Sequence, residues 1–311
     1  MKRLFTILAV AFTAVLFSVN AYAQDLAAAA ENYKNAAEAF NAGNKVEALA
    51  GFQKALEEAT ALGDEGAELA TECKKLIPTV LLALGKDCVT NKDMDKAVEY
   101  LNQAITIGKE FEQTEVENEA KELVPVVLMA DGDSMLNEGK FAEAAARYNE
   151  VLAIDPENAT AYIRTGMCQS KLGNEAAAIE AYTKAAEKGE KDAAYKQLNT
   201  MYVNKAVTAF KAKDNAGALD NALKAGEYGE NFNSDKIGGI AAFNLKKNDT
   251  AIKLLEQAVK ANPNATDIRY YLARAYEAKG NKVKAVENYK KIVGDAKFKA
   301  FAEQKIKALG A

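Results

Sequence analysis

The stretch YIRTGMCQSKLGNEAAAIEAYTKA, residues 162–185, decides the fold class of this chain. Helix-forming residues fill both of its halves, and Gly173-Asn174 separates them. Glycine and asparagine tolerate the backbone conformations that end a helix and reverse the chain. The stretch therefore predicts two antiparallel helices joined by a short turn.

The same pattern recurs along most of the chain. When Ala178 is taken as an anchor, the equivalent residues lie at spacings of 49, 47, 34, 40, 33 and 34. The residue twelve positions before each anchor is Gly or Ala, the residue five before is Gly or Lys, and the residue seven after is apolar. The anchors are Ala48, Ala97, Ala144, Ala178, Ala218, Ala251 and Ala285. Such self-similarity predicts an all-α solenoid in which stacked helix pairs supply the core.

The pattern also predicts how the helices pack. A small residue in the first helix of a pair lets the second helix approach closely. The residue four positions after the anchor is mostly large, as in Leu101, Tyr182 and Leu255. We expect this large side chain to fill the gap toward the neighbouring pair.

The repeats resemble those of the tetratricopeptide (TPR) family. The fourth copy carries the resemblance best, and the seventh follows it; the third and sixth close with Asp155-Pro156 and Asn262-Pro263, as family units often do. No copy has the Trp of the family, and the fifth and sixth are degenerate. The matching residues are Tyr162, Gly166, Gly173, Ala178, Tyr182 and Ala185, then Leu272, Ala273, Tyr276, Gly280, Ala285 and Tyr289. The resemblance implies a right-handed superhelix of about seven helix-turn-helix units over residues 27–299.

Two copies in the first half are longer than the family unit. Residues 73–85 align with residues 120–132 at an offset of 47, and each copy has about thirteen to fifteen added residues. We interpret these as helical extension, although the apolar run 76–84 taken alone also suits a buried strand. Pro78 and Pro125 are expected to start or kink the first helix of their units, at repeat boundaries. Residues 296–311 are predicted to form a C-terminal capping helix, from Ala296 to Leu309.

The N-terminus predicts export. Lys2 and Arg3 precede an apolar run, and Ala21 and Ala23 suit a signal peptidase, so residues 1–23 read as a signal peptide. The alternative is a membrane anchor, but the run is shorter than the roughly 20 residues that span a bilayer. We therefore expect a soluble, periplasmic protein of the bacterial envelope without stable membrane insertion. The remaining divisions are elongated repeats over 24–124, TPR repeats over 125–295, and the cap.

Composition argues against catalysis. The chain has no His and no Trp, so the usual general base and the common zinc ligand sets are missing. Its three cysteines form no C-x-x-C pair and are read as buried thiols. Acidic clusters such as Glu115–Glu122 are interpreted as exposed helix faces. We predict no enzyme activity, no metal and no cofactor, and the acidic charge disfavours nucleic acid.

Function is therefore expected on a surface. In the TPR family the first helices line a concave groove that commonly binds peptides, and the resemblance carries these positions to ten candidate contacts. They are Tyr33, Phe40, Met129, Ile163, Met167, Phe210, Lys236, Phe243, Tyr270 and Arg274. Lys236 and Arg274 suit a carboxylate, yet the paired Lys and Asn of chaperone-binding repeats are not reproduced, so no chaperone-tail ligand is predicted.

Two functions follow from this surface. The first is a non-catalytic scaffold that binds a protein or peptide partner along the groove. The alternative is a glycan- or envelope-polymer-binding protein in which Tyr270 and Tyr271 stack on sugar rings, and the lack of Trp counts against it. The identity of the partner and the oligomeric state are left open.

Overall fold

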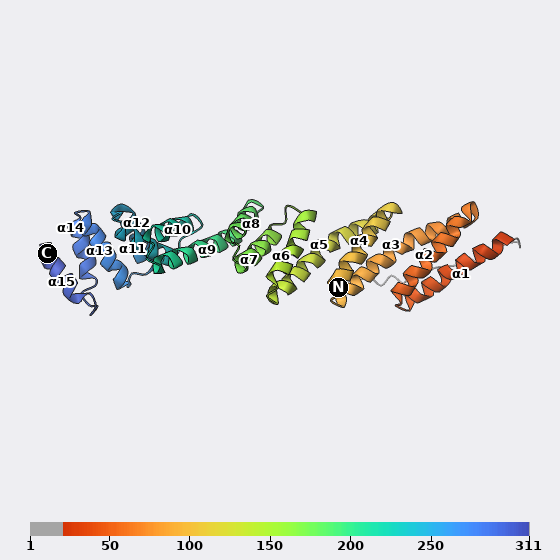
Figure 1. Ribbon diagram of the computed structural model, residues 1–311, viewed down its shortest axis with the longest axis horizontal. Helices are drawn as coiled ribbons and strands as arrows, with labels where there is room; N and C mark the ends of the chain where they lie inside the picture. Colours follow the sequence, from red (N-terminus) through yellow and green to blue (C-terminus); the bar gives the residue numbers. More distant parts are fainter. Residues whose placement is uncertain (1–20, 311) are drawn as a thin grey trace. The chain divides into compact units, whose positions relative to one another are not determined.

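The computed structural model describes residues 21–310, and this part of the chain consists of helices without any strand (Figure 1). It divides into two compact units, residues 21–134 and 135–310. The first holds α1 (Ala21–Asn41), α2 (Lys45–Ala61), the short 3-10 helix η1 (Gly63–Gly66), α3 (Ala67–Thr90), α4 (Met94–Glu110) and most of α5 (Thr114–Asn137). The second holds α6 (Phe141–Ile154), α7 (Ala159–Lys171), α8 (Glu175–Glu187), α9 (Lys191–Lys211), α10 (Asn215–Glu227), α11 (Phe232–Asn244), α12 (Asn248–Ala261), α13 (Thr266–Ala278), α14 (Lys282–Lys290) and α15 (Lys299–Ala308).

Within each unit, helices that follow one another in the chain pack together, as the repeats require. Within the first unit α1 packs on α2, α2 on α3, and α3 on α4; within the second, successive helices from α6 to α15 do the same. All seven anchor alanines have no exposed surface, and neither do the apolar residues seven positions after them. The predicted all-α repeat architecture is confirmed.

Close approach within a pair depends on the small residue of the first helix. A Cβ on Gly166 would stand 2.6 Å from the Cε1 atom of Tyr182, and one on Gly239 would stand 2.6 Å from Cγ of Leu255. The large side chain thus lies over the small residue of its own pair. Tyr182 also belongs to one buried cluster with Ala194 and Leu198 of α9, the first helix of the next pair, as expected.

The turn inside each pair has the same backbone conformation in all seven copies. The residue five positions before the anchor has a positive φ whether it is glycine, as in Gly43, Gly139, Gly173 and Gly280, or lysine, as in Lys92, Lys213 and Lys246. This left-handed residue ends the first helix, and the second helix begins after one more residue. The seven breaks seen in the sequence are therefore seven equivalent helix ends.

The added residues of the long copies extend the first helices. α3 and α5 each have 24 residues, against 13 for α7 and α13, and residues 76–84 are helical, which excludes the strand alternative. Pro78 and Pro125 lie inside α3 and α5. The expectation that they start their helices at repeat boundaries is wrong, because the extension adds helical turns before each proline. The boundary predicted at residues 124 and 125 falls inside α5, whereas the compact units divide after residue 134.

The structure describes the predicted C-terminal cap but not most of the predicted signal peptide. At the C-terminus, α15 packs on α14. It begins at Lys299, three residues later than predicted, because residues 291–298 form turns. Phe301 of α15 makes an edge contact with Tyr289, with ring centroids 6.0 Å apart. The capping helix is thus confirmed. The predicted signal peptide lies outside the described residues except for residues 21–23.

Candidate functional site

All ten candidate contact residues lie on the first helices of their pairs. Tyr33 and Phe40 are on α1, Met129 on α5, Ile163 and Met167 on α7, Phe210 on α9, Lys236 and Phe243 on α11, and Tyr270 and Arg274 on α13. Tyr33 is only 5% exposed and packs edge-on against Phe52, so its ring belongs to the core of the first pair. The other nine are partly buried.

Three of the ten are brought together on α11 and α13. The guanidinium of Arg274 lies 4.9 Å from the ring centre of Phe243 and 5.3 Å from that of Tyr270. Its Nη1 also donates a hydrogen bond of 3.1 Å to the Tyr270 hydroxyl. Arg274 forms no ion pair with any residue of the described part of the chain. Contact with both rings fixes the planar cation at the surface of the first helices.

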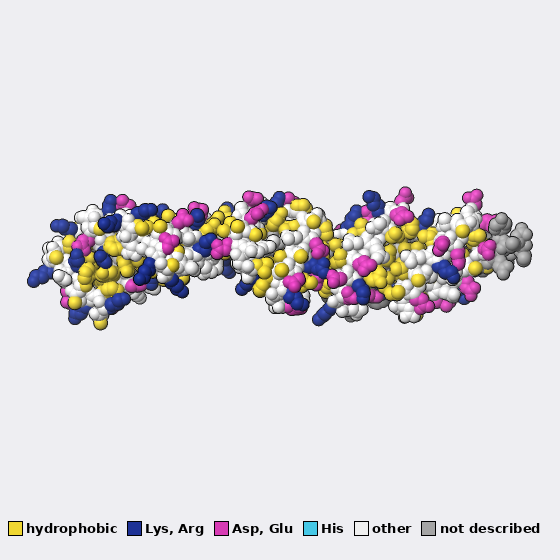
Figure 2. All heavy atoms as spheres, viewed as in Figure 1, with side chains coloured by type: hydrophobic (Ala, Val, Ile, Leu, Met, Phe, Trp, Pro, Cys, Tyr) yellow, Lys and Arg dark blue, Asp and Glu magenta, His cyan; other side chains and the backbone are white. Residues whose placement is uncertain are grey.

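The aromatic support of Arg274 continues onto the capping helix. The Tyr270 ring stacks on Phe298 at 4.9 Å, lies 5.2 Å from Phe301, and meets Tyr271 edge-on at 5.3 Å. These contacts hold Tyr270 and, through it, Arg274. Figure 2 shows hydrophobic side chains in a patch bordered by lysines and arginines toward the C-terminal end of the second unit.

Lys236 has a different environment from the one predicted. Its ammonium pairs with Asp267 of α13 at 2.6 Å, and both side chains are about one-third to two-fifths exposed. An ion pair of this kind must be broken, or shared, before Lys236 can bind a carboxylate. The two predicted cations therefore have different neighbours. Lys236 forms an ion pair with Asp267, whereas Arg274 packs on the rings of Phe243 and Tyr270.

A second carboxylate on the same surface is also neutralised from within the chain. Glu277 accepts hydrogen bonds from Lys305 at 2.6 Å and from the Tyr289 hydroxyl at 2.8 Å. Burial would raise the pKa of Glu277, but these two donors and the nearby charge of Arg274 outweigh that effect and hold the pKa below its usual range. The cap thus contributes a cation, Lys305, to the end of the first-helix surface.

Sequence reasoning missed several of these neighbours, although the sequence held a signal for some. Lys236 and Asp267 are 31 positions apart and lie on successive first helices. Lys86 and Glu119, 33 apart, form a similar pair between α3 and α5 at 2.6 Å. A search for Lys and acid at about one repeat length would have found such pairs. The contact of Tyr270 with Phe298 had no such signal, because Phe298 lies beyond the last repeat.

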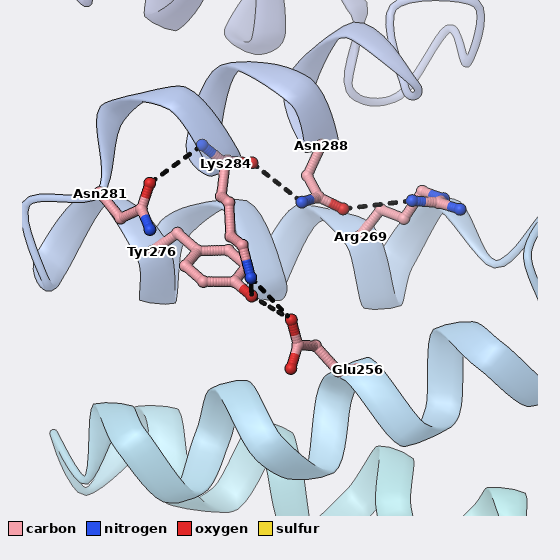
Figure 3. Close-up of polar contacts among 6 residues, drawn as sticks. All are labelled: Glu256, Arg269, Tyr276, Asn281, Lys284 and Asn288. Atoms are coloured by element: carbon pink, nitrogen blue, oxygen red, sulfur yellow. Dashed lines mark hydrogen bonds and ion pairs between the residues drawn. The ribbon is translucent and has the colours of Figure 1, made fainter.

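The second helices of the last two pairs are connected by a polar cluster (Figure 3). The Tyr276 hydroxyl of α13 bonds to Glu256 of α12, and Lys284 of α14 lies 3.0 Å from that hydroxyl and 3.4 Å from Glu256. In the figure these three side chains point toward one another from three helices. The side chains of Lys284 and Glu256 are about half exposed. We interpret the cluster as a tie between consecutive pairs.

Other features of the described chain give no sign of bound metal or of a membrane span. Residues 21–310 contain no group of three or more acidic, Cys or His side chains placed to hold a metal ion. No helix within these residues is long and apolar enough to cross a membrane. Cys73 and Cys168 are fully buried and Cys88 is partly so. Burial raises the pKa of the Cys73 thiol to about 12, which keeps it protonated.

Paired helices with equivalent turns, anchors and a first-helix surface define an α-helical repeat protein. Family models of the tetratricopeptide repeat match residues 79–109, 135–201 and 238–300. The chain belongs to the tetratricopeptide repeat family, as its fourth and seventh copies indicated.

Comparison with solved structures returns chains of low sequence identity to this one. A crystal structure of MamA is 23% identical, with 57% of this chain and 94% of that one covered and a TM-score of 0.37. YrrB, described as a TPR protein with an unusual peptide-binding site, is 19% identical, with coverages of 62% and 97% and a TM-score of 0.36. The TPR2AB domain of yeast Sti1 in complex with pHSP90 is 16% identical, with coverages of 76% and 99% and a TM-score of 0.34. A search of curated proteins finds no match.

Proposed function

We propose that this protein is a non-catalytic scaffold of the bacterial cell envelope that binds a peptide or partner segment along the surface of its first helices. Its tetratricopeptide repeats support a role in protein–protein interaction. The observation that carries the proposal further is Arg274, a cation supported by Phe243 and Tyr270 that forms no ion pair within the described chain, although its charge acts on nearby Glu277. Arginine and aromatic residues together are typical of the centres of protein interfaces.

The surroundings of Tyr270 favour a polypeptide over the glycan alternative. A sugar ring stacks on an open aromatic face, but the Tyr270 ring is surrounded by Phe298, Phe301, Tyr271 and Arg274. Little of that ring is left for a sugar. A polypeptide needs no open ring face, because it can place a carboxylate or carbonyl oxygen on the guanidinium and apolar groups against the ring edges.

The proposal is tested by affinity capture from the native envelope fraction. The bait is the mature protein, residues 24–311, beside a variant with Lys236, Phe243 and Arg274 replaced by Ala. A matched control replaces Leu223, Lys224 and Lys253 by Ala, which removes the same numbers of cations and large apolar groups from the second helices α10 and α12.

The expected result is a protein captured by the wild type and the control but lost with the first variant, then confirmed with the purified partner by calorimetry. Circular dichroism must show that all three baits are folded. Equal capture by all three baits would reject the Arg274 surface. Capture of a polysaccharide in place of a protein would favour the glycan alternative.

A further inference from the structure

The first unit has a hollow of its own, beside the corner that joins α4 to α5. The hollow has a volume of about 370 Å³ and is lined by Lys75, Leu76 and Thr79 of α3 and by residues 112–116. This volume is in the range of sites that hold small ligands or a few side chains. Glu112 has a positive φ of 56°, which turns the chain at the rim of the hollow.

The charges at this hollow are acidic and are not neutralised from within the chain. Lys75 is the sole cation among the lining residues, and its ammonium pairs with Glu72 at 2.7 Å. Glu112 and Glu115 form no ion pair with any residue in the range 21–310. Glu115 lies in the first turn of α5. Two carboxylates thus face a site large enough for a ligand.

An apolar surface adjoins the two carboxylates. Leu76 and Thr79 also line a second, much smaller hollow of about 10 Å³, together with Ala37 and Phe40 of α1. That space holds no more than about one water-sized group. Leu76 and Thr79 therefore lie between the acidic hollow and the small apolar hollow.

The net charge of the N-terminal part of the chain also favours a cationic ligand. Residues 24–130 carry 10 basic and 20 acidic side chains, a net charge of −10. A field of this sign raises the local concentration of cationic ligands and speeds their association. The second unit ends differently, since residues 266–311 carry a net charge of +6.

We propose, on the basis of the proposed function, that the first-helix surface of the first unit takes an extended polypeptide segment in which Lys or Arg stands next to an aliphatic residue. The cation enters the hollow between Glu112 and Glu115. The aliphatic side chain covers Leu76 and Thr79 toward Phe40. This surface is independent of Arg274, so one chain holds two binding surfaces that prefer ligands of opposite charge.

The test uses a fluorescent peptide, acetyl-Gly-Leu-Lys-Leu-Lys-Gly-amide, and the mature protein, residues 24–311. Fluorescence anisotropy compares the wild type with a Glu112→Gln/Glu115→Gln variant. A Glu47→Gln/Glu57→Gln variant is the matched control, because it removes the same two charges from exposed positions of α2, one of them in a first helical turn. We expect the first variant to bind about tenfold more weakly, the control to bind like the wild type, and wild-type affinity to fall with added salt.

Three results would overturn the proposal. The first is equal binding by both charge variants; the second is equal binding of a peptide in which Glu replaces Lys. The third is wild-type self-association in sedimentation that is lost with Glu112→Gln/Glu115→Gln, since the occupant is then a second copy of the chain. The variant with Lys236, Phe243 and Arg274 replaced by Ala should bind this peptide like the wild type. Failure of the Arg274 surface to bind a partner can therefore be told apart from failure of the hollow to bind the peptide.

Discussion

The ring of Tyr182 lies directly over the α-carbon of Gly166, so that a Cβ at residue 166 would stand 2.6 Å from the ring edge. Both residues are buried, on α7 and α8 of one helix pair. This contact allows the two helices to approach closely, and it leaves no room for a side chain.

Replacing Gly166 with Leu should therefore destabilise the second unit by about 2–3 kcal/mol through overpacking against Tyr182. Thermal unfolding followed by circular dichroism measures the change. Gly226→Leu is the control, because Gly226 is also helical and a Cβ there meets nothing within 4 Å. Equal melting temperatures for both variants and the wild type would refute the register of the repeats.

Replacing Lys246 with Gly should stabilise the protein by up to about 1 kcal/mol. Lys246 has a φ of 62°, a conformation that costs a residue with a Cβ roughly 1 kcal/mol or more, partly offset by the greater freedom of glycine in the unfolded chain. Gly280→Lys, at the equivalent turn, should have the opposite sign. Urea denaturation of both variants checks this, and a shift in the same direction for both would contradict the strain argument.

Asp235→Asn should stabilise the second unit at pH 7 and have little effect at pH 4. Burial, with a smaller contribution from Glu230, raises the pKa of Asp235 from 3.8 to about 6. The folded state thus holds this proton more tightly than the unfolded state, so the stabilisation is full below pH 4 and is lost as the pH rises through 6. We expect a gain of about 1 kcal/mol at pH 7, after solvent screening is allowed for. Melting temperatures of both proteins at pH 4 and pH 7 provide the measurement, and a difference independent of pH would contradict it.

We predict that the protein is exported and that its mature form begins at Gln24. The charged, apolar and small-residue order of residues 1–23 is typical of a cleaved signal peptide. Expression of the full chain in a Gram-negative bacterium, followed by fractionation and intact mass measurement, tests this. Recovery of the uncleaved chain in the membrane pellet would instead support the anchor alternative.

The repeat fold could be predicted because each pair repeats the same local requirements. Ala178 and its equivalents must be small and buried, and Lys246 aligns with Gly280 only when the turns are compared in register. Such constraints act between residues close in the sequence and leave a periodic trace. The prediction that Pro78 starts a helix is wrong. Proline is common at helix starts, but here helical turns of α3 precede it.

The candidate site could be predicted only in part. The position of Arg274 on a first helix follows from the repeat register. Its contact with Phe243, on the previous first helix, depends on how two pairs stack. The hollow at Glu112 depends on a corner whose φ is positive at a residue that is not glycine, whereas Gly63, Gly189 and Gly229 have the positive φ at the corresponding corners between other pairs.

The contact between Gly166 and Tyr182 has a consequence for how such a chain can change in length. Both partners belong to one helix pair, and the left-handed turn at Gly173 lies between them. Deletion of one repeat length would therefore remove a complete glycine–tyrosine contact together with its turn, and duplication would add one. Insertions of whole repeats should be tolerated far better than insertions of a few residues inside a pair, because only the latter separate Tyr182 from the glycine it covers.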